Sequence, residues 1–357
     1  MITKYQQIAD DLFTKIKNNE YQVGTMIPPE SKLREIYQVS RYTIRQAIGV
    51  LVDKGYLRAE KGAGTYVLDP KIATSQKPTK TIGVITTYLS DYIFPTIIEG
   101  IEEVLRSKGY ALLVSATHND SGQEESCLQA MLAQGIDGLL IEPTSSNQYN
   151  PNIATYAKLK ERGLPILFLN AYYDMLDIPY VSLDDSGAGE LATRYLIEQG
   201  HKNIGLLAKL DDLQGKLRMK GYIRAHKQKN LDFSANHIAT FDTQNQKEII
   251  KTFAKSIAEK QQTPTAVVCY NDEVASYLIQ QLHKYQLFVP KDISIVSHDN
   301  SYLAKVYQLT GIIHPQKQLG QYAAEQLIQN VEKQKPLQSK EYPAELKERN
   351  SVLKHDF

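Results

Sequence analysis

Residues 26–67 read MIPPESKLREIYQVSRYTIRQAIGVLVDKGYLRAEKGAGTYV, and this stretch decides the fold of the N-terminal part of the chain. Its pattern predicts a helix over 30–37 with Leu33 and Ile36 on one face, a turn at 38–39, and a second helix that Ser40 caps. In the second helix Ile44, Ala47, Ile48 and Leu51 follow the spacing of one buried stripe. A two-stranded hairpin completes the stretch. Helix, turn, helix and hairpin in this order predict a winged helix-turn-helix.

The exposed face of the second helix has the side chains that read DNA. It carries Ser40, Arg41, Thr43 and Arg45, with Tyr42 beside them. Arginine donates to guanine O6 and N7 in the major groove, and hydroxyls bind phosphates. The hairpin tip contains Lys61, Gly62 and Gly64, and glycines let backbone N–H groups approach a phosphate or a minor groove. Solvated arginines on a surface helix are the alternative, but that alternative leaves the glycine tip unexplained. We therefore expect DNA binding.

This segment resembles the GntR family of bacterial regulators. The family pattern runs P-x-E-x-x-L, V-S-R-x-T-[IV]-R-x-A-[IL], L-x-x-x-G and G-x-G-T-[FY]-V, and the chain matches it from Pro28 to Val67 without a break. The resemblance implies that Ser40, Arg41, Thr43 and Arg45 contact operator DNA and that the tip at 61–64 reaches the adjacent groove. Lys4 and Tyr5, at the start of a first helix over 5–17, are expected to clamp a phosphate. Glu30 either accepts a hydrogen bond from cytosine N4 or caps its own helix, and both interpretations stay open.

Length and composition limit the remaining possibilities. The chain has 357 residues, which suits two to three compact units. Its net charge is +1, but residues 40–62 hold five Lys/Arg against two Asp/Glu, a local charge of +3. Cys127 and Cys269 fall in apolar segments, so we expect reduced core residues and no metal site. A polar helix follows Met1 directly and no apolar run reaches membrane-spanning length, so we expect a cytoplasmic protein.

A linker separates this head from a second unit. Residues 69–80 contain two prolines and no periodicity, so the predicted division is a winged helix-turn-helix over 1–68, the linker, and a second unit over 81–357. In the second unit, apolar runs alternate with amphipathic helices of roughly ten to sixteen residues. The runs are 81–88, 110–117, 138–143, 165–170, 180–184, 203–208, 266–270 and 294–297. This alternation predicts an α/β fold with parallel sheets covered on both faces.

Polar clusters directly follow several of these runs, where ligands bind parallel sheets. The clusters include Tyr88, Ser90 and Asp91, then Glu142, Asn170 with Tyr172, Asp184 with Asp185, Asn271 with Asp272, and His298 with Asp299. Each polar residue taken singly also suits a helix cap, and for Asp185 and Asn271 capping and ligand contact remain equally open. Together, carboxylates, amides and tyrosines indicate a site for a neutral polyol. Arg218 adds a planar donor at a helix start, unless it forms a surface ion pair.

Residues 80–357 resemble the LacI/GalR effector domain, a two-lobed periplasmic-binding-protein type I fold. The resemblance rests on the stretches at 180–189, 200–205, 218–222, 264–272, 289–296, 320–328 and 346–351. It implies Arg218, Asp272 and Asp299 as main sugar contacts. Secondary contacts are implied for Tyr88, Ser90, Asp91, Glu142, Asn170, Asp184 and Gln316. The chain reads Val296-Ser-His-Asp299 where the family usually has Val-Gly-Phe-Asp, so His298 leaves the exact ligand open.

A GntR head on a LacI-type unit resembles the L-arabinose-responsive repressors of Gram-positive bacteria, which implies L-arabinose as effector and no cofactor. We expect a homodimer on double-stranded operator DNA, with the helices at 95–107 and 123–134 as dimer faces. A different pentose, a hexose or a purine is the alternative ligand. An enzyme is not expected, because the sequence shows no phosphate-cradling glycine loop, no metal-ligand spacing and no nucleophile elbow.

Overall fold

The computed structural model describes residues 3–53, 55–60, 64–68, 79–89, 92–260 and 264–355. The chain divides into two compact units, Met1–Thr79 and Lys80–Phe357. Residues 69–78 of the expected linker lie outside the described residues. Within the described ranges, no helix combines the length and the apolar character that crossing a membrane requires.

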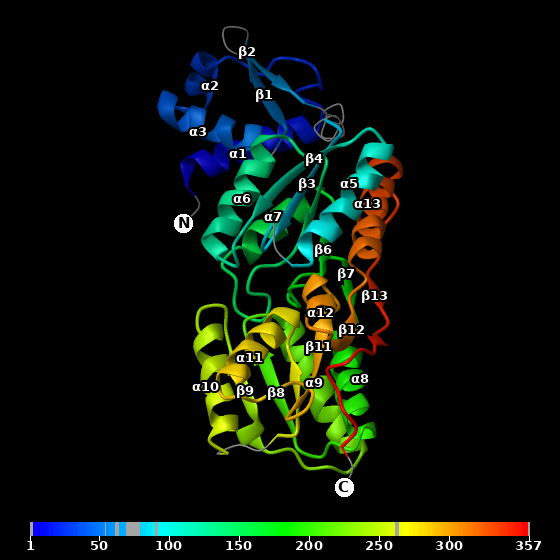
Figure 1. Ribbon diagram of the computed structural model, residues 1–357. Helices are drawn as coiled ribbons and strands as arrows, with labels where there is room; N and C mark the ends of the chain where they lie inside the picture. Colours follow the sequence, from blue (N-terminus) through cyan, green and yellow to red (C-terminus); the bar gives the residue numbers. More distant parts are fainter. Residues whose placement is uncertain are drawn as a thin grey trace. The chain divides into compact units, whose positions relative to one another are not determined.

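The first unit, which we call the head, packs helices against a hairpin (Figure 1). Its elements are α1 Lys4–Lys17, α2 Glu30–Tyr37, α3 Arg41–Asp53, β1 Leu57–Glu60 and β2 Gly64–Val67. β1 and β2 are antiparallel. Leu33 and Ile44 are fully buried in the head core, whereas Ile36 is 51% exposed and does not share the buried face. Gln38 has φ +48° at the end of α2, and Ser40 Oγ accepts from the backbone N–H of Thr43 at 3.2 Å. The predicted turn and cap are therefore confirmed.

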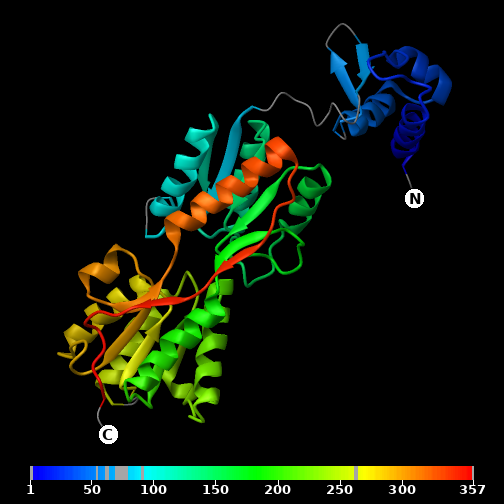
Figure 2. The same cartoon turned by 90° about the vertical axis from the view of Figure 1, so that its right-hand side faces the viewer.

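The second unit consists of two lobes, each an open sheet between helices (Figures 1 and 2). In lobe 1 the strand order is β13-β7-β6-β5-β3-β4, and all neighbouring strands are parallel. Its strands are β3 Thr81–Thr86, β4 Ala111–Ala116, β5 Gly138–Ile141, β6 Ile166–Leu169, β7 Tyr180–Leu183 and β13 Lys340–Tyr342. Its helices are α5 Phe94–Ser107, α6 Ser121–Ala133, α7 Ile153–Glu161 and α13 Gln316–Lys333.

Lobe 2 repeats this plan with the order β14-β12-β11-β10-β8-β9, in which β14 alone among the described strands is antiparallel to its neighbour. Its strands are β8 Ile204–Lys209, β9 Ile238–Phe241, β10 Ala266–Cys269, β11 Ser294–Asp299, β12 Thr310–Ile313 and β14 Glu345–Lys347. Its helices are α8 Asp185–Glu198, α9 Leu213–Gln228, η1 Ala235–His237, α10 Gln246–Ala258, α11 Asp272–Lys284 and α12 Tyr302–Val306. The predicted α/β architecture is confirmed.

Helices cover both faces of each sheet, which explains why the strands read as continuous apolar runs. In lobe 1 one core lies under α5 and α13, and a second lies under α6 and α7. In lobe 2 the two cores lie under α10 and α11 and under α8 and α9. Cys269 is buried and Cys127 is partly buried, both as free thiols.

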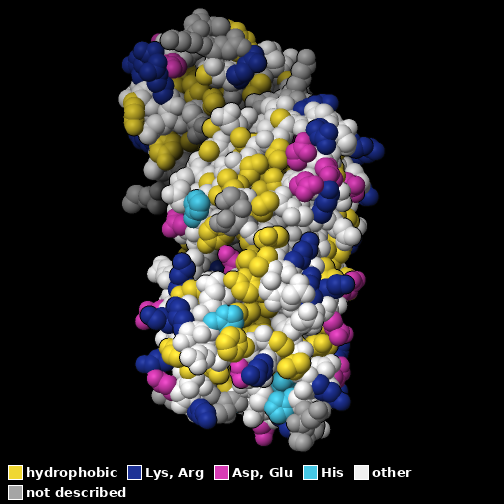
Figure 3. Space-filling model, viewed as in Figure 1, with side chains coloured by type: hydrophobic (Ala, Val, Ile, Leu, Met, Phe, Trp, Pro, Cys, Tyr) yellow, Lys and Arg dark blue, Asp and Glu magenta, His cyan; other side chains and the backbone are white. Residues whose placement is uncertain are grey.

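The helices α5 and α13 pack with their backbones in contact. A Cβ atom on Gly320 of α13 would lie 2.2 Å from the carbonyl oxygen of Ile97 on α5. At the surface of this pair, Lys317 forms ion pairs with Glu99 at 3.0 Å and Glu103 at 2.6 Å. Figure 3 shows acidic and basic side chains gathered together over this region. The contact with α13 occupies one side of α5, a helix that the sequence also proposes as a dimer face.

Candidate functional site

A cavity of about 280 Å³ lies between the two lobes, at the carboxyl ends of their strands. Ligands bind parallel sheets at this end, because loops from several strands converge there. The lining residues are Thr87, Tyr88, Tyr92, Ile93, Phe94, Asn119, Glu142, Pro143, Ser146, Asn170, Asp185, Lys209, Asp212, Gln214, Arg218, Thr243, Gln246, Tyr270, Asn271, Glu273, Asp299 and His314. Five of them carry carboxyl groups, against one lysine and one arginine, so the cavity suits a neutral ligand better than an anion.

Arg218 of α9 is the fixed donor of the cavity. Its Nε donates to Asp185 Oδ1 at 2.8 Å and its Nη2 to Asp299 Oδ1 at 3.1 Å. Nη1 donates to the carbonyl oxygen of Tyr270 at 2.6 Å, and the guanidinium carbon lies 5.1 Å from the centre of the Tyr270 ring. Burial alone would lower the pKa of Arg218, but Asp299 and Asp185 raise it, so the group stays charged. Since a guanidinium has five N–H donors, two remain for a ligand.

Asp299 joins this donor to lobe 1. Tyr92, which precedes α5 in lobe 1, donates its hydroxyl to Asp299 Oδ2 at 2.6 Å. Burial alone would raise the pKa of Asp299, but Arg218 and further neighbours, among them the Tyr92 hydroxyl, together lower it, so the carboxyl is ionised. The backbone of Asp299 has φ +92°, a strained conformation for a residue with a side chain. Gln316 Nε2 donates to the Asp299 carbonyl at 3.1 Å and so supports this conformation.

The lobe 1 wall presents hydrogen-bond acceptors. Glu142 Oε2 accepts from the backbone N–H and the hydroxyl of Thr87 at 3.1 and 2.5 Å, and Oε1 accepts from Asn170 Nδ2 at 2.9 Å. That bond fixes the Asn170 amide so that its Oδ1, which is buried and has no partner among the described residues, can accept from a ligand. Burial raises the pKa of Glu142 to about 7. A ligand hydroxyl donor therefore fits this wall.

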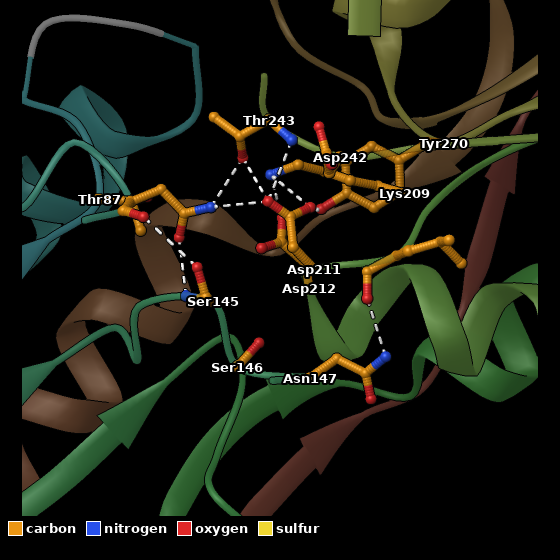
Figure 4. Close-up of polar contacts among 12 residues, drawn as sticks. Thr87, Ser145, Ser146, Asn147, Lys209, Asp211, Asp212, Asp242, Thr243 and Tyr270 are labelled. Atoms are coloured by element: carbon orange, nitrogen blue, oxygen red, sulfur yellow. Dashed lines mark hydrogen bonds and ion pairs between the residues drawn. The ribbon is translucent and has the colours of Figure 1, made fainter. Parts of the chain in front are cut away.

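Lys209, Asp212 and Tyr270 form a second polar group on the lobe 2 wall (Figure 4). Lys209 Nζ lies 2.6 Å from Asp212 Oδ2, which also accepts from the Tyr270 hydroxyl at 2.9 Å. His314 closes the cavity nearby, and its Nδ1 has no partner among the described residues. Burial lowers the pKa of His314 to about 4, so the ring is neutral at pH 7. Two lining residues from opposite lobes, Asn170 and His314, thus each have a buried polar atom without a partner among the described residues.

In the head, α3 presents the residues that the sequence singled out. Arg41, Tyr42 and Arg45 are exposed, with Tyr42 at 71%. Both arginines donate to one carboxylate, since Arg41 Nε lies 2.6 Å from Glu30 Oε2 and Arg45 Nε lies 2.9 Å from Glu30 Oε1. The Arg41 hydrogen bond outweighs desolvation and lowers the pKa of Glu30, which is therefore ionised at neutral pH. Glu30 orients two guanidinium groups and neutralises part of their charge.

The remaining head residues lie as follows. Lys4 is exposed at the start of α1, and Tyr5 is partly buried against the head core. The Ser40 hydroxyl lies 2.9 Å from the Thr43 hydroxyl. Gly64 opens β2 with φ +129°, a conformation that favours glycine. Lys61 and Gly62 lie outside the described residues.

Comparison with known proteins assigns both units. Residues 79–350 match the periplasmic binding proteins and sugar binding domain of the LacI family, and residues 4–67 match the gntR family of bacterial regulatory proteins. The chain belongs to the LacI family, with a GntR head. Both resemblances that the sequence suggested are confirmed.

Relatives of full length share this combination. The chain is 40% identical over 337 residues to the arabinose metabolism transcriptional repressor of Geobacillus stearothermophilus, covering 93% of this chain and 92% of that protein. It is 37% identical over 341 residues to the protein of the same name from Halalkalibacterium halodurans, covering 94% and 91%. The solved structure of the transcription regulator CcpA of Lactococcus lactis matches with a TM-score of 0.67 and 26% identity, over 76% of this chain and 98% of that chain.

Five predicted effector contacts line the cavity of the LacI-type unit: Tyr88, Glu142, Asn170, Arg218 and Asp299. Ser90 and Asp91 lie outside the described residues. Tyr172 and Asp184 do not line the cavity. Tyr172 stacks on Tyr180 with ring centres 4.1 Å apart, and Asp184 caps α8 by accepting from the N–H of Gly187 at 2.8 Å. The next residue, Asp185, reaches the cavity instead.

Three further predicted contacts lie behind the cavity wall. Asp272 is fully buried; its carboxylate accepts from the Ser297 hydroxyl and, at 2.7 Å, from the N–H of Ser301. Burial raises its pKa to about 6. His298 is also fully buried, with Nδ1 2.9 Å from the Cys269 carbonyl. Gln316 holds the Asp299 backbone, as described above. These residues stand behind the ligand-facing layer and support it.

Sequence reasoning missed several lining residues although the signal was present. Lys209 and Asp212 directly follow the apolar run that ends at Ala208, and Asn119 follows the run that ends at Thr117. These are the same strand-end positions that pointed to Glu142. His314 follows β12, a strand that was not among the predicted runs. Tyr92 lies four residues after the run that ends at Tyr88, as Asp212 lies four residues after Ala208, so it shares this signal.

Proposed function

We propose that this chain is a sugar-responsive transcriptional repressor that binds operator DNA as a dimer and is released by L-arabinose. The main observation behind the proposal is the charged guanidinium group of Arg218, which donates to Asp185 and Asp299. It lies in a cavity that residues of both lobes line. The names of the two full-length relatives support arabinose as the sugar. The proposal implies a cytoplasmic protein without a catalytic role, because its DNA target is in the cytoplasm.

The effector contacts follow from the chemistry of the two walls. Glu142 and the free Oδ1 of Asn170 accept hydrogen bonds from ligand hydroxyls on lobe 1. Arg218 donates to ligand oxygens on lobe 2, and Asp185 and Asp299 offer acceptors beside it. Tyr88 supplies an aromatic surface for the sugar C–H groups. A ligand that uses both walls favours the closed arrangement of the lobes, and this difference in affinity drives the response.

Operator contacts are assigned to α3 and the hairpin tip. On operator DNA, Arg41 and Arg45 would exchange their hydrogen bonds with Glu30 for bonds with base edges or phosphates. Ser40, Tyr42 and Thr43 would contact the DNA backbone beside them. Lys4 and Tyr5 would hold a phosphate, and the tip with Lys61, Gly62 and Gly64 would enter the neighbouring groove. Because each head reads one half-site, a dimer with faces on α5 and α6 would match a palindromic operator.

The decisive experiment is an operator titration in the presence and absence of sugar. Purified protein is added at low and at physiological salt to a labelled duplex with inverted half-sites and to a scrambled duplex. The proposal predicts preference for the inverted sites and release by L-arabinose. A different pentose, a hexose or a purine that alone caused release would replace arabinose as the effector. Failure to distinguish the two duplexes would refute operator binding itself.

A further inference from the structure

The two lobes are joined at one edge of their sheets. The described chain passes between the lobes three times: from β7 to α8, from β12 to α13, and from β13 to β14. β13 and β7 are the first two strands in the order of lobe 1, and β14 and β12 are the first two in lobe 2. All three connections therefore lie at the same edge, and the strands farthest from it are β4 and β9. Lobe opening would separate the loops that follow these far strands most.

At this far edge, hydrogen bonds cross from one lobe to the other. Asn119, in the loop after β4, donates from Nδ2 to Asp211 Oδ2 at 3.2 Å and to Thr243 Oγ1 at 2.8 Å. The same Asp211 oxygen accepts from the N–H of Thr243 at 3.0 Å and from its hydroxyl at 2.6 Å. Asp211 follows β8 and Thr243 follows β9, so one carboxylate connects two loops of lobe 2 to lobe 1 (Figure 4).

A second strip of bonds extends this contact. The N–H of Asn147 donates to the Asp211 carbonyl at 3.1 Å, and Asn147 Nδ2 donates to the Leu210 carbonyl at 2.8 Å. The N–H of Leu213 donates to Ser146 Oγ at 2.8 Å. We call these contacts the seam. It comprises Asn119, Ser146 and Asn147 of lobe 1 with Leu210, Asp211, Leu213 and Thr243 of lobe 2.

Asp211 is suited to control the seam without touching a ligand. Its side chain is 6% exposed and does not line the cavity, whereas Asn119 and Thr243, its two partners, do. Lys209 Nζ lies 3.6 Å from Asp211 Oδ1, which stabilises the buried carboxylate. Hydrogen bonds to a charged group are among the stronger ones in proteins, so loss of Asp211 weakens the seam more than loss of a neutral partner.

We propose that Asp211 is a positioning residue for effector binding, which holds Asn119 and Thr243 together across the seam and thereby favours the closed lobes. This inference rests on the proposed function. Since a ligand that contacts both walls binds the closed arrangement, a weaker seam lowers its apparent affinity in proportion to the closed population.

The first test compares Asp211→Ala with Asp242→Ala in the full-length protein by calorimetric titration with L-arabinose. Asp242 is the matched control because it lies in the Thr243 loop and its Oδ1 accepts from the N–H groups of Gln244 and Asn245, within its own lobe. Asp211→Ala should bind arabinose about ten-fold more weakly than wild type. Asp242→Ala should keep the wild-type affinity, and neither variant should bind operator more weakly than wild type without sugar. Equal arabinose affinities in the two variants would overturn the proposal.

A second variant tests the seam independently of any local structural change that Asp211→Ala causes. Asn147 does not line the cavity, and Asn147→Ala removes one bond of the seam while leaving every lining side chain in place. Its arabinose affinity should fall by roughly three-fold, as expected for one neutral hydrogen bond. Wild-type affinity in Asn147→Ala would count against closure through the seam.

Amide hydrogen exchange measured without sugar tests the seam independently of which sugar is the effector. The amides of Asn147 and Leu213 donate across the seam, so they should exchange faster in Asp211→Ala than in Asp242→Ala or wild type. If these rates differ but wild type does not bind arabinose, the effector assignment fails and the seam stands. If the rates are equal while arabinose still releases wild type from the operator, the seam fails and the proposed function stands.

Discussion

Arg45 and Arg218 use the same guanidinium group in opposite ways. Arg218 is buried, and three of its five N–H donors are bound within lobe 2, so it cannot turn to a different partner without leaving two carboxylates unpaired. Arg45 has a side chain that is 60% exposed and shares Glu30 with Arg41. Exposed ion pairs are weak, so Arg45 can exchange Glu30 for DNA at low cost.

Substitution of Arg45 should therefore separate base reading from phosphate binding. If Arg45 donates to a guanine, Arg45→Ala should weaken operator binding by about 1–3 kcal/mol and reduce discrimination against mismatched sites. Fluorescence anisotropy at one fixed salt concentration measures both quantities. An equal loss on operator and scrambled DNA would identify a phosphate contact. Arg34→Ala, which changes an exposed arginine on α2, is the control for general charge loss.

Glu142 should give the protein a measurable pH dependence. Burial raises its pKa to about 7 from an ordinary value of 4.5. The folded state thus holds the proton more tightly than the unfolded state, so ionisation of Glu142 destabilises the fold. This cost is absent below pH 4.5, grows as the pH rises to about 7, and is constant above; at 1.36 kcal/mol per pKa unit it amounts to about 3 kcal/mol.

Glu142→Gln should remove that dependence. The free energy of unfolding of wild type, relative to this variant, should fall between pH 4.5 and pH 7 and then level off. Urea unfolding of the full chain, followed by circular dichroism, provides the measurement. Glu345→Gln, at an exposed carboxyl, should show the same pH profile as wild type. A pH-independent difference between wild type and Glu142→Gln would contradict the expectation.

At the level of elements, the close contact of α8 with α9 positions Arg218. A Cβ atom on Gly189 of α8 would lie 2.1 Å from the carbonyl oxygen of Arg218 on α9, and one on Gly221 would lie 2.1 Å from the Ser186 carbonyl. Because backbone atoms oppose each glycine, no side-chain rotation can make room for a methyl group.

Gly189→Ala should therefore push α9 away and move Arg218. We expect a loss of stability of roughly 1–3 kcal/mol, together with weaker arabinose binding. Gly49→Ala in α3 is the opposite case, because nothing lies within 4 Å of its Cβ position. It should stabilise the head by up to about 1 kcal/mol. Thermal unfolding compares the two, and a Gly189→Ala protein as stable as wild type would refute the packing argument.

The elements were more predictable than the site. Apolar periodicity located α3 and most strands of the two parallel sheets, because burial on one or both faces leaves a regular apolar pattern in the sequence. It did not locate β9, β12, β13 or β14. The strand-end rule placed Glu142, Asn170 and Asp299 at the cavity, but it could not choose between Asp184 and Asp185. These neighbours differ by one step around the start of α8, where one side chain caps the helix and the other turns to Arg218. That choice depends on packing across the lobe, which no local pattern contains.

At the scale of the whole molecule, we expect communication between sugar and DNA to depend on the chain between the units. The sequence predicts a linker at 69–80, most of which lies outside the described residues. Its two prolines disfavour a long helix there. If the linker transmits lobe closure to the heads, its length should matter.

Insertion of a Gly/Ser segment into 69–80 tests this dependence. Operator binding and arabinose binding should each persist, whereas release of operator by arabinose should weaken because a flexible segment absorbs the displacement. Thermodynamic reciprocity supplies an internal control: operator DNA should lose its influence on arabinose affinity to the same degree. Undiminished release would exclude a mechanical role for the linker.

The position of all three lobe connections at one edge also affects how long a bound sugar stays in the cavity. With all three connections at one edge, opening of the lobes has to break the contacts of Asn119, Asn147 and Leu213 that cross the seam. The lifetime of the occupied state then depends on the rate of that rupture as well as on the contacts of the ligand with the two walls. Two variants with equal sugar affinity could thus differ in how long their target genes stay active after the sugar is exhausted.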